Sequence, residues 1–378
     1  MTQKTRSLVW LGGLVFILGI VVLLWRSITP SEAQRIIPEQ QPASQQQEMA
    51  TSSVPVGVAA SSTTVLPVAT TTSVSTDISL LVVGDIMLDR NVAARTKKSG
   101  NPRYPFLQLP TDWVSGFDFS LANLEGPVTP VRRPPVKSID FQFDPAWTGV
   151  LKSEGWDGFS QANNHALDQG SAGYADSVSR LRQAGFVTFG HQVDDGLIAL
   201  ATTTIKGERF AFLGWNNTDN PVNRVQAAEA IATAKAESDL VIAYLHWGNE
   251  YRDRPDAQNV ELAHWLIDQG VDIVIGGHPH WVQGFSSYKG KPIVWSLGNF
   301  IFDQDWSKET QQGLAIELSI APETIRILPV PLSIKASQPK KEGGAMLATR
   351  LEALAKISDK ELQQMIKEGK ELVFARDN

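Results

Sequence analysis

Residues 78–85, ISLLVVGD, form an apolar run that ends in a carboxylate. A short run without helical spacing predicts a strand that is buried on both faces. Similar runs recur along the chain, and amphipathic stretches such as 175–184 and 257–269 separate several of them. This alternation predicts an α/β fold. The other predicted strands are FVTFG, RFAFLGW, LVIAYLHWG, VDIVIGGH, KPIVWSLGNF, GLAIELSI and TIRILPVPL.

A strand-rich tail begins at residues 296–299. Its apolar runs follow one another without an amphipathic stretch between them, a pattern typical of strands that pair with their sequence neighbours. We therefore expect a second, more antiparallel sheet from this point onward. The whole globular region spans residues 78–335.

The amino-terminal segment, residues 1–27, carries an apolar run behind two positive charges. Lys4 and Arg6 precede the uncharged stretch from Leu8 to Trp25, whose 18 residues can just cross a bilayer as a helix. Positive charges stay on the cytoplasmic side of such a helix. We predict a single-pass membrane anchor with the globular region outside the cytoplasm.

A cleaved signal peptide is the alternative for this segment. Residues 31–33, Ser-Glu-Ala, weakly resemble a small-x-small cleavage site. The apolar region of a signal peptide is usually only about 7–15 residues long. The greater length of the run, with Trp10 and Trp25 near its ends as interfacial anchors, favours an uncleaved anchor.

Two further segments flank the globular region. Residues 28–77 are rich in Ser, Thr, Gln, Val and Pro and show no long helical or strand period, so we predict a solvated, disordered tether. Residues 336–378 begin with a polar loop and continue with apolar residues at helical spacing. We predict a structural extension of one or two helices there.

The composition of the 378-residue chain excludes several kinds of site. The formal net charge is -6 and the pI is about 5.6, so the chain has no general basic field and nucleic acid is a poor candidate partner. The chain contains no cysteine, which excludes disulfides, thiolate metal sites and cysteine nucleophiles. Any metal must be held by nitrogen and oxygen.

Polar side chains gather where the apolar runs end. In open α/β sheets, ligands bind at this carboxyl edge of the strands. Carboxylate, amide and imidazole groups together form the donor set of a hard-to-borderline divalent metal centre. We predict that such a centre is formed by Asp85, Glu125, Asn164, His246, His278 and His280.

Each of these residues taken alone would more often be a cap, a turn residue or a bonded core histidine. Their shared position makes that interpretation weaker. The spacing of His278 and His280 lets both rings face one side of an extended segment, which Pro279 stiffens. His191, in a polar loop, and His264, in a helical pattern, are interpreted as structural.

Six motifs occur in order along the chain, namely GDIMLDR, NLEGPVT, ANNHALDQG, LHWGNEY, GGHPHWVQ and WSLGNFIFDQ. In order and spacing they resemble the bacterial CapA family of poly-gamma-glutamate capsule biosynthesis proteins. The resemblance covers nearly all of residues 78–305. It places the chain near the calcineurin-like metallophosphoesterases and implies their fold, a four-layer α/β/β/α sandwich of two facing sheets flanked by helices.

The resemblance also implies roles for single residues. Asp85 matches the first metal-binding aspartate, and Glu125 stands where a metal-bridging carboxylate is expected. Asn164 would bind metal through its amide oxygen, which leaves His165 as a catalytic proton donor or oxyanion stabiliser. The remaining imidazole ligands are His246, His278 and His280. Substrate contacts are expected from Arg90, Asn123, Asn163 and Asn299.

One departure from the phosphoesterase pattern concerns the first motif. An Asp-x-His sequence is expected there, whereas this chain has Asp85-Ile86-Met87. Methionine is a poor ligand for Mn, Mg or Zn. The second motif is Asn-Leu-Glu in place of an aspartate-rich loop. We therefore expect one metal position to have lost a ligand.

Three functions remain open at this point. The first is a membrane-tethered factor for biosynthesis or assembly of a capsule or cell-envelope polymer of the poly-gamma-glutamate type. Its partners would be an anionic envelope polymer and capsule-synthesis membrane proteins. The second is an active hydrolase that uses Mn, Zn, Fe or Mg to cleave an envelope phosphoester or amide polymer. The third, an inert spacer, leaves the polar clusters unexplained.

Overall fold

The computed structural model describes residues 77–190 and 200–376. The predicted anchor, all but the last residue of the predicted tether, and His191 lie outside the described residues. Among the residues that are described, no helix has both the length and the apolar character needed to cross a bilayer.

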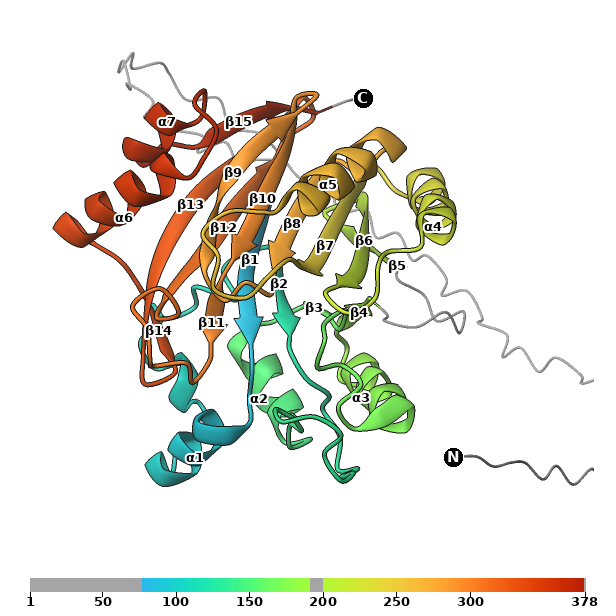
Figure 1. Cartoon of the computed structure of the whole chain (residues 1–378), viewed down its shortest axis with the longest axis vertical. Coiled ribbons are helices and arrows are strands. Elements are labelled where there is room, and N and C mark those ends of the chain that lie inside the picture. Colours follow the sequence, from blue (N-terminus) through green and yellow to red (C-terminus); the bar gives the residue numbers. More distant parts are fainter. Residues whose placement is uncertain (1–76, 191–199, 377–378) are drawn as a thin grey trace, which may run out of the picture. The chain divides into compact units, whose positions relative to one another are not determined.

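The first sheet begins with four parallel strands. The order β1-β2-β3-β4 follows the sequence, and helices lie between consecutive strands (Figure 1). The strands are β1 (Ile78–Ile86), β2 (Phe119–Leu124), β3 (Gly158–Ser160) and β4 (Val187–Phe189). The helices are α1 (Arg90–Ser99), the short 3₁₀ helix η1 (Tyr104–Phe106), α2 (Trp147–Glu154) and α3 (Gly170–Gln183).

The carboxyl-terminal strands extend this same sheet, so the expectation of a separate second sheet from residues 296–299 onward is wrong. β12 pairs antiparallel with β1, from Ile78 opposite Ile320 to Val82 opposite Ile316. Strand β1 thus has partners on both sides, and local periodicity cannot show which distant strand fills its second edge. The added strands are β11 (Asn299–Ile301), β12 (Gln312–Ile320), β13 (Thr324–Lys335), β14 (Gln338–Lys341) and β15 (Leu372–Ala375).

The second sheet comes from the middle of the chain. Its order is β5-β6-β7-β8-β10-β9, with β6, β7, β8 and β10 parallel. The strands are β5 (Leu200–Ile205), β6 (Glu208–Asn217), β7 (Leu240–Trp247), β8 (Ile273–Gly277), β9 (Val282–Tyr288) and β10 (Lys291–Leu297). Two helices connect the parallel strands, α4 (Arg224–Glu237) and α5 (Ala257–Gln269).

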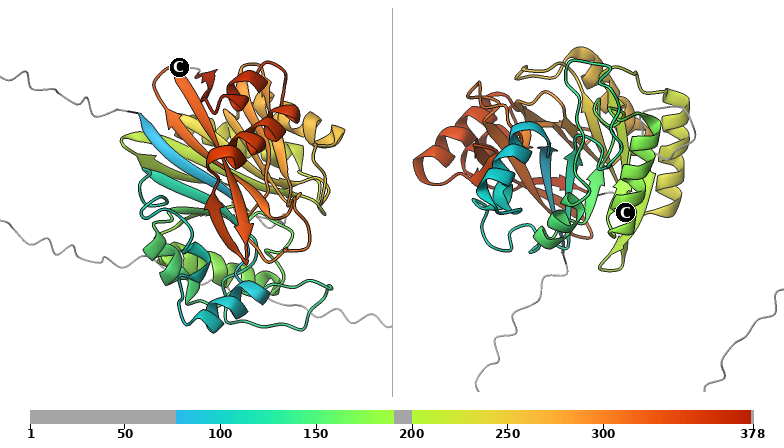
Figure 2. Two further views of the ribbon diagram at one scale, coloured as in Figure 1. Left: turned by 90° about the vertical axis from the view of Figure 1, so that its left-hand side faces the viewer. Right: turned by 90° about the horizontal axis from the view of Figure 1, so that it is seen from below.

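Alternate residues of the buried strands enter different cores. In β1, Leu80 and Val82 join the core between the two sheets, whereas Leu81 and Val83 join the core that includes α1, α2 and α3. On the far side of the second sheet, residues of β7 such as Val241 pack with α4 and α5. The two-residue strand period therefore yields helices, sheet, sheet and helices, the four layers that the resemblance implied (Figure 2).

The chain after residue 335 contains the two expected helices, α6 (Gly344–Lys356) and α7 (Gln363–Lys367). It also contains strands β14 and β15, which the sequence did not predict. Both pair with β13, and Leu354 and Ile366 reach the core between the sheets. The carboxyl-terminal segment is therefore part of the sandwich.

The carboxyl ends of the central strands meet at one edge. β1 and β2 are parallel, β7 and β8 are parallel, and all four point toward the lower part of the view in Figure 1. The predicted polar residues lie at these strand ends. Two facing sheets thus bring distant segments of the sequence to one place.

Candidate metal centre

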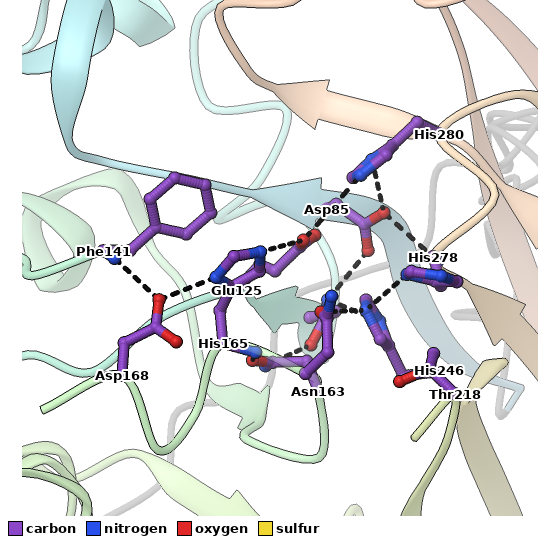
Figure 3. A network of polar contacts seen from close by, with 12 residues as sticks. Asp85, Glu125, Phe141, Asn163, His165, Asp168, Thr218, His246, His278 and His280 are labelled. Atoms are coloured by element: carbon purple, nitrogen blue, oxygen red, sulfur yellow. Dashed lines mark hydrogen bonds and ion pairs between the residues drawn. The ribbon is translucent and has the colours of Figure 1, made fainter. Parts of the chain in front are cut away.

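The six predicted ligands lie together at this edge: Figure 3 labels five of them, and the sixth, Asn164, contacts His246. Asp85 is in β1, Glu125 directly follows β2, and Asn164 lies in the loop after β3. The second sheet supplies His246 from β7, and His278 and His280 from the turn after β8. Apart from Asn164, which is partly exposed, they are buried.

Asp85, Glu125 and His280 form what we call the carboxylate half. His280 lies between the two acids, with its Nδ1 3.6 Å from Asp85 Oδ2 and its Nε2 3.9 Å from Glu125 Oε1. Asp85 is held in place because its oxygens accept hydrogen bonds from Asn123 Nδ2 (2.8 Å) and the His278 backbone N–H (3.3 Å). These three donors lie close enough together to share an ion.

Glu125 is the most unusual group in the centre. It is fully buried, and within the described residues neither of its carboxylate oxygens has a hydrogen-bond partner. Burial, and then the negative charge of Asp85, raise the pKa of Glu125 well above its usual range. A buried and unpaired carboxylate costs several kcal/mol. A cation between Glu125 and Asp85 would offset that cost, so the residues present fit a divalent metal ion.

Asn164, His246 and His278 form the imidazole half. His246 Nε2 lies 3.0 Å from Asn164 Oδ1 and 3.2 Å from His278 Nδ1. Ligand atoms at about 2.1 Å from a metal and at roughly tetrahedral or octahedral angles are about 3.0–3.4 Å apart. The two spacings from His246 therefore also fit donors that share an ion.

Both rings of the imidazole half are held neutral. Burial, followed by the neighbouring rings of His278 and His280, lowers the pKa of His246 well below its usual value. Burial and His280 lower the pKa of His278 to about 4. Because metals bind the neutral imidazole, both rings are in the binding form at neutral pH.

His280 is oriented by Asn299. The Asn299 amide nitrogen donates to the Thr310 carbonyl (3.0 Å), so its oxygen faces His280 Nδ1 at 2.9 Å. His280 Nδ1 therefore carries the proton, and the lone pair of Nε2 is directed toward Glu125. A partner that fixes the ring in this way is typical of metal-binding histidines.

Of the predicted substrate contacts, Asn123, Asn163 and Asn299 are fully buried. Asn123 Nδ2 lies 3.3 Å from His246 Nδ1, and its oxygen accepts from Asn163 Nδ2 (3.0 Å). Asn123 contacts His246, Asn163 bonds Asn123, and Asn299 contacts His280, so these amides help to position the imidazole ligands. Arg90 has a different setting, since its guanidinium pairs with Asp303 and lies 5.0 Å from the centre of the Phe141 ring.

His165 is next to the carboxylate half. Its Nε2 lies 4.0 Å from Glu125 Oε1, and its ring lies against Phe141 with 4.0 Å between the ring centres. Its Nδ1 is 2.7 Å from Asp168 Oδ2. Burial lowers the pKa of His165, although Asp168 opposes the shift. The ring therefore presents Nε2 to the centre, as a proton donor or acceptor there requires.

Asp168 is a site residue that the sequence analysis missed. It also accepts a hydrogen bond from the Phe141 backbone N–H (2.7 Å) and lies 2.6 Å from Lys137 Nζ. Its position in the motif ANNHALDQG, three residues after His165, was the available signal. An acid three residues after a candidate catalytic histidine is a candidate hydrogen-bond partner of that ring.

Met87 belongs to the apolar core beside α1. Its sulfur accepts a hydrogen bond from the Asp89 backbone N–H at 3.1 Å. The first motif therefore supplies the centre with Asp85, and the side chain two residues later is used for packing. His264 likewise has a structural setting, because its ring stacks on Tyr288 with 3.8 Å between the ring centres.

The backbone of the His-Pro-His turn differs from the extended segment that we expected. His278 and His280 have positive φ angles of 93° and 55°, which are uncommon for residues other than glycine. Both rings still face the centre, 5.9 Å apart. They do so because the chain turns sharply after β8, so the extended-segment explanation is wrong. Strained backbone of this kind is common at functional sites.

Known proteins resemble this chain over the same region. The capsule biosynthesis protein CapA of Bacillus anthracis is 29% identical over 72% of this chain and 72% of its own length. The PGA biosynthesis protein CapA of Bacillus subtilis is 29% identical over 61% of this chain and 65% of its own length, just under two thirds. Among solved structures, the NAD nucleotidase of Haemophilus influenzae aligns with 77% of this chain and 59% of its own at 14% identity and a TM-score of 0.37, too low to support an argument.

The family model described as bacterial capsule synthesis protein PGA_cap matches residues 79–304. This range includes all six ligands, His165 and Asn299, and it is more than half of the 378 residues. The chain belongs to the bacterial capsule synthesis protein PGA_cap family.

Proposed function

We propose that this protein is a membrane-anchored, extracytoplasmic factor for biosynthesis or assembly of a capsule or envelope polymer of the poly-gamma-glutamate type. The match of the family model over residues 79–304 carries the proposal. The two CapA relatives named above support it, since one is called a capsule and the other a PGA biosynthesis protein. The expected partners are the anionic polymer and capsule-synthesis membrane proteins.

The proposed location rests on the sequence of residues 1–27. The apolar run behind Lys4 and Arg6 would hold the amino end in the cytoplasm and the domain outside. Protease added to intact spheroplasts should therefore digest or release the domain. Protection in intact spheroplasts, with digestion only after lysis, would reverse the proposed topology.

We infer that the centre binds a divalent metal ion through nitrogen and oxygen donors, with Mn, Zn, Fe and Mg as the candidates. The carboxylate half and the imidazole half would each contribute three of the donors described above. When bound, such an ion supplies a Lewis acid and lowers the pKa of bound water. The chain itself fixes the donors, excludes bulk water from Glu125 and holds His165 beside it.

A hydrolase is the second candidate function, and the setting of His165 favours it. A purely structural histidine needs no free nitrogen directed at a metal centre, whereas His165 bonds Asp168 through Nδ1 and leaves Nε2 4.0 Å from Glu125. In this arrangement Asp168 keeps the ring in one orientation with the proton on Nδ1, so Nε2 can take a proton from an attacking water and then pass it to a leaving oxygen or nitrogen. The bond cleaved would be a phosphoester or an amide in an envelope polymer.

Replacement of His165 by Gln separates the two candidate functions. For a hydrolase, turnover of a phosphodiester or of the capsule polymer should fall by about 10²- to 10⁴-fold. Bound metal and melting temperature should barely change, because His165 is not a ligand. His264→Gln is the matched control, since His264 stacks on Tyr288 instead.

Three outcomes decide between the functions. A large loss of turnover at unchanged metal content supports the hydrolase. A metal-loaded wild-type protein that turns over neither substrate supports assembly alone. Loss of metal or a collapsed melting temperature in His165→Gln would make His165 a ligand or a core residue.

A further inference from the structure

Glu250 lies in the loop after β7, four residues beyond His246. One of its carboxylate oxygens and one ring nitrogen from each of His278 and His280 all lie within 4.8 Å of one another. His280 is also the histidine of the carboxylate half. Glu250 therefore borders the same centre.

The loop that carries Glu250 is fixed to the His-Pro-His turn. The backbone N–H of Tyr251 donates to the Pro279 carbonyl at 2.9 Å. Gly248 has a φ of 81°, and a Cβ there would lie 2.7 Å from Asn259 Nδ2, so only glycine fits without strain. The Tyr251 bond thus holds the backbone next to Glu250 against the turn that carries the two imidazoles.

Glu250 differs from the other two acids in exposure. Asp85 and Glu125 are fully buried, whereas Glu250 is exposed. An exposed acid can reach an ion in the centre from the solvent side.

A carboxylate such as that of Glu250 suits this centre because oxygen and imidazole donors bind the same divalent ions. Within the described residues, Glu250 is the exposed acid that groups with two of the histidines.

We propose that Glu250 is a metal ligand that enters the centre from the solvent side, beside His278 and His280. The proposal rests on the metal centre inferred under Proposed function. Since Glu250 is exposed, its removal uncovers no buried charge and leaves the fold intact. Its contribution is therefore measurable as metal affinity, independent of any catalytic activity.

The test compares Mn²⁺ binding by full-length wild type, Glu250→Gln and Glu229→Gln, using isothermal titration calorimetry in detergent. Glu229 is an exposed glutamate of α4 and controls for the loss of one surface charge. Glu250→Gln should weaken Mn²⁺ binding by about 10- to 100-fold. Its melting temperature without metal should match the wild type, and Glu229→Gln should bind as the wild type does.

A third variant, Glu250→His, supplies a different metal ligand at the same place. It should bind Mn²⁺ more tightly than Glu250→Gln, which a charge effect alone would not produce. The proposal is overturned if Glu250→Gln binds Mn²⁺ as tightly as the wild type, or if Glu250→His binds no better than Glu250→Gln. A wild type that binds no Mn²⁺ would instead overturn the metal centre itself.

Discussion

The two halves of the candidate metal centre differ in how their buried polar atoms are satisfied. In the imidazole half, His246 Nε2 lies within hydrogen-bond distance of both Asn164 and His278. In the carboxylate half, within the described residues, neither oxygen of Glu125 is hydrogen-bonded. One half can thus close on itself without an ion, whereas the other leaves a buried acid without compensation.

The difference follows from the chemistry of the groups. A neutral imidazole both donates and accepts, so two rings and an amide can bond one another. An ionised carboxylate only accepts, and two of them side by side repel each other. The carboxylate half therefore needs a cation to compensate its charge, whereas the imidazole half contributes donors whose spacing fits an ion.

Removal of metal should have the largest effect. An ion that binds only the folded state stabilises it by about 4 kcal/mol when present at about 1,000 times its Kd. We expect the free energy of unfolding of the wild type to fall by about that amount when a chelator replaces saturating Mn²⁺. Denaturant unfolding measures it. Equal stability in chelator and in Mn²⁺ would show that the carboxylate half needs no cation.

The pH dependence of the metal-free protein should show opposite signs for the two halves. The pKa of His278 is lowered to about 4 from 6.5, so the unfolded chain binds the proton more readily and stability rises with pH between these values. This term is of the order of 3 kcal/mol. The pKa of Glu125 is raised from 4.5, so its term lowers stability as pH rises from about 4.5 toward the raised value.

The free energy of unfolding, measured from about pH 4 to pH 8 in chelator, separates the contribution of His278 from that of Glu125. His278→Gln should reduce the part of the curve that rises, to which His246 and His165 also contribute because their pKa values are lowered too, and Glu125→Gln should reduce the part that falls. If both variants change the pH profile in the same direction, the two halves do not differ as described.

Removal of one imidazole should destabilise the metal-free protein moderately. His246→Ala removes the ring partner of the buried His278 Nδ1 and of the partly exposed Asn164 Oδ1, whereas Asn123 keeps its bond to Asp85. We expect a loss of about 2 kcal/mol in chelator, measured by denaturant unfolding. His264→Ala, outside the centre, should cost less. A loss for His246→Ala no greater than for His264→Ala would mean that the imidazole half is not closed by its own bonds.

The smallest effect should have the opposite sign. Glu125→Gln replaces a buried acid by a neutral amide, so the metal-free protein should become more stable by about 1 kcal/mol, while metal binding is weakened. Thermal unfolding in chelator measures the gain. Asp85→Asn is the control, because Asp85 is already hydrogen-bonded by Asn123 and His278 and its replacement should bring no gain. A destabilised Glu125→Gln protein would show that Glu125 has a partner in solution.

Much of the fold could be predicted from the sequence because the central strands are buried on both faces. Such strands appear as continuous apolar runs, and β1, β7 and β8 were all recognised in this way. The pairing of β12 with β1 could not be predicted, since hydrogen-bonding edges leave no local pattern. Strands β14 and β15 are short; β14 lies in the stretch predicted as a polar loop, and β15 lies in the stretch whose apolar spacing predicted helices.

The candidate site was predicted where a polar residue ends an apolar run, as for Asp85 and His246. Asp168 had only its spacing of three residues from His165 as a signal, and Glu250 lies among other polar residues, so the composition of its loop does not set it apart. Their positions depend on tertiary contacts, namely the Phe141 backbone bond to Asp168 and the Pro279 bond beside Glu250. The positive φ angles of His278 and His280 likewise come from the turn, which residue type alone does not indicate.

The central claim is that the buried cluster of acids, histidines and Asn164 is a divalent metal centre. Metal analysis by mass spectrometry of the purified full-length protein, before and after incubation with Mn²⁺ and with the double variant Asp85→Ala/His280→Ala as control, tests it most directly. We predict near-stoichiometric bound metal in the wild type and almost none in the variant. A wild type that holds no metal even after incubation, or a variant that holds as much as the wild type, would contradict the claim.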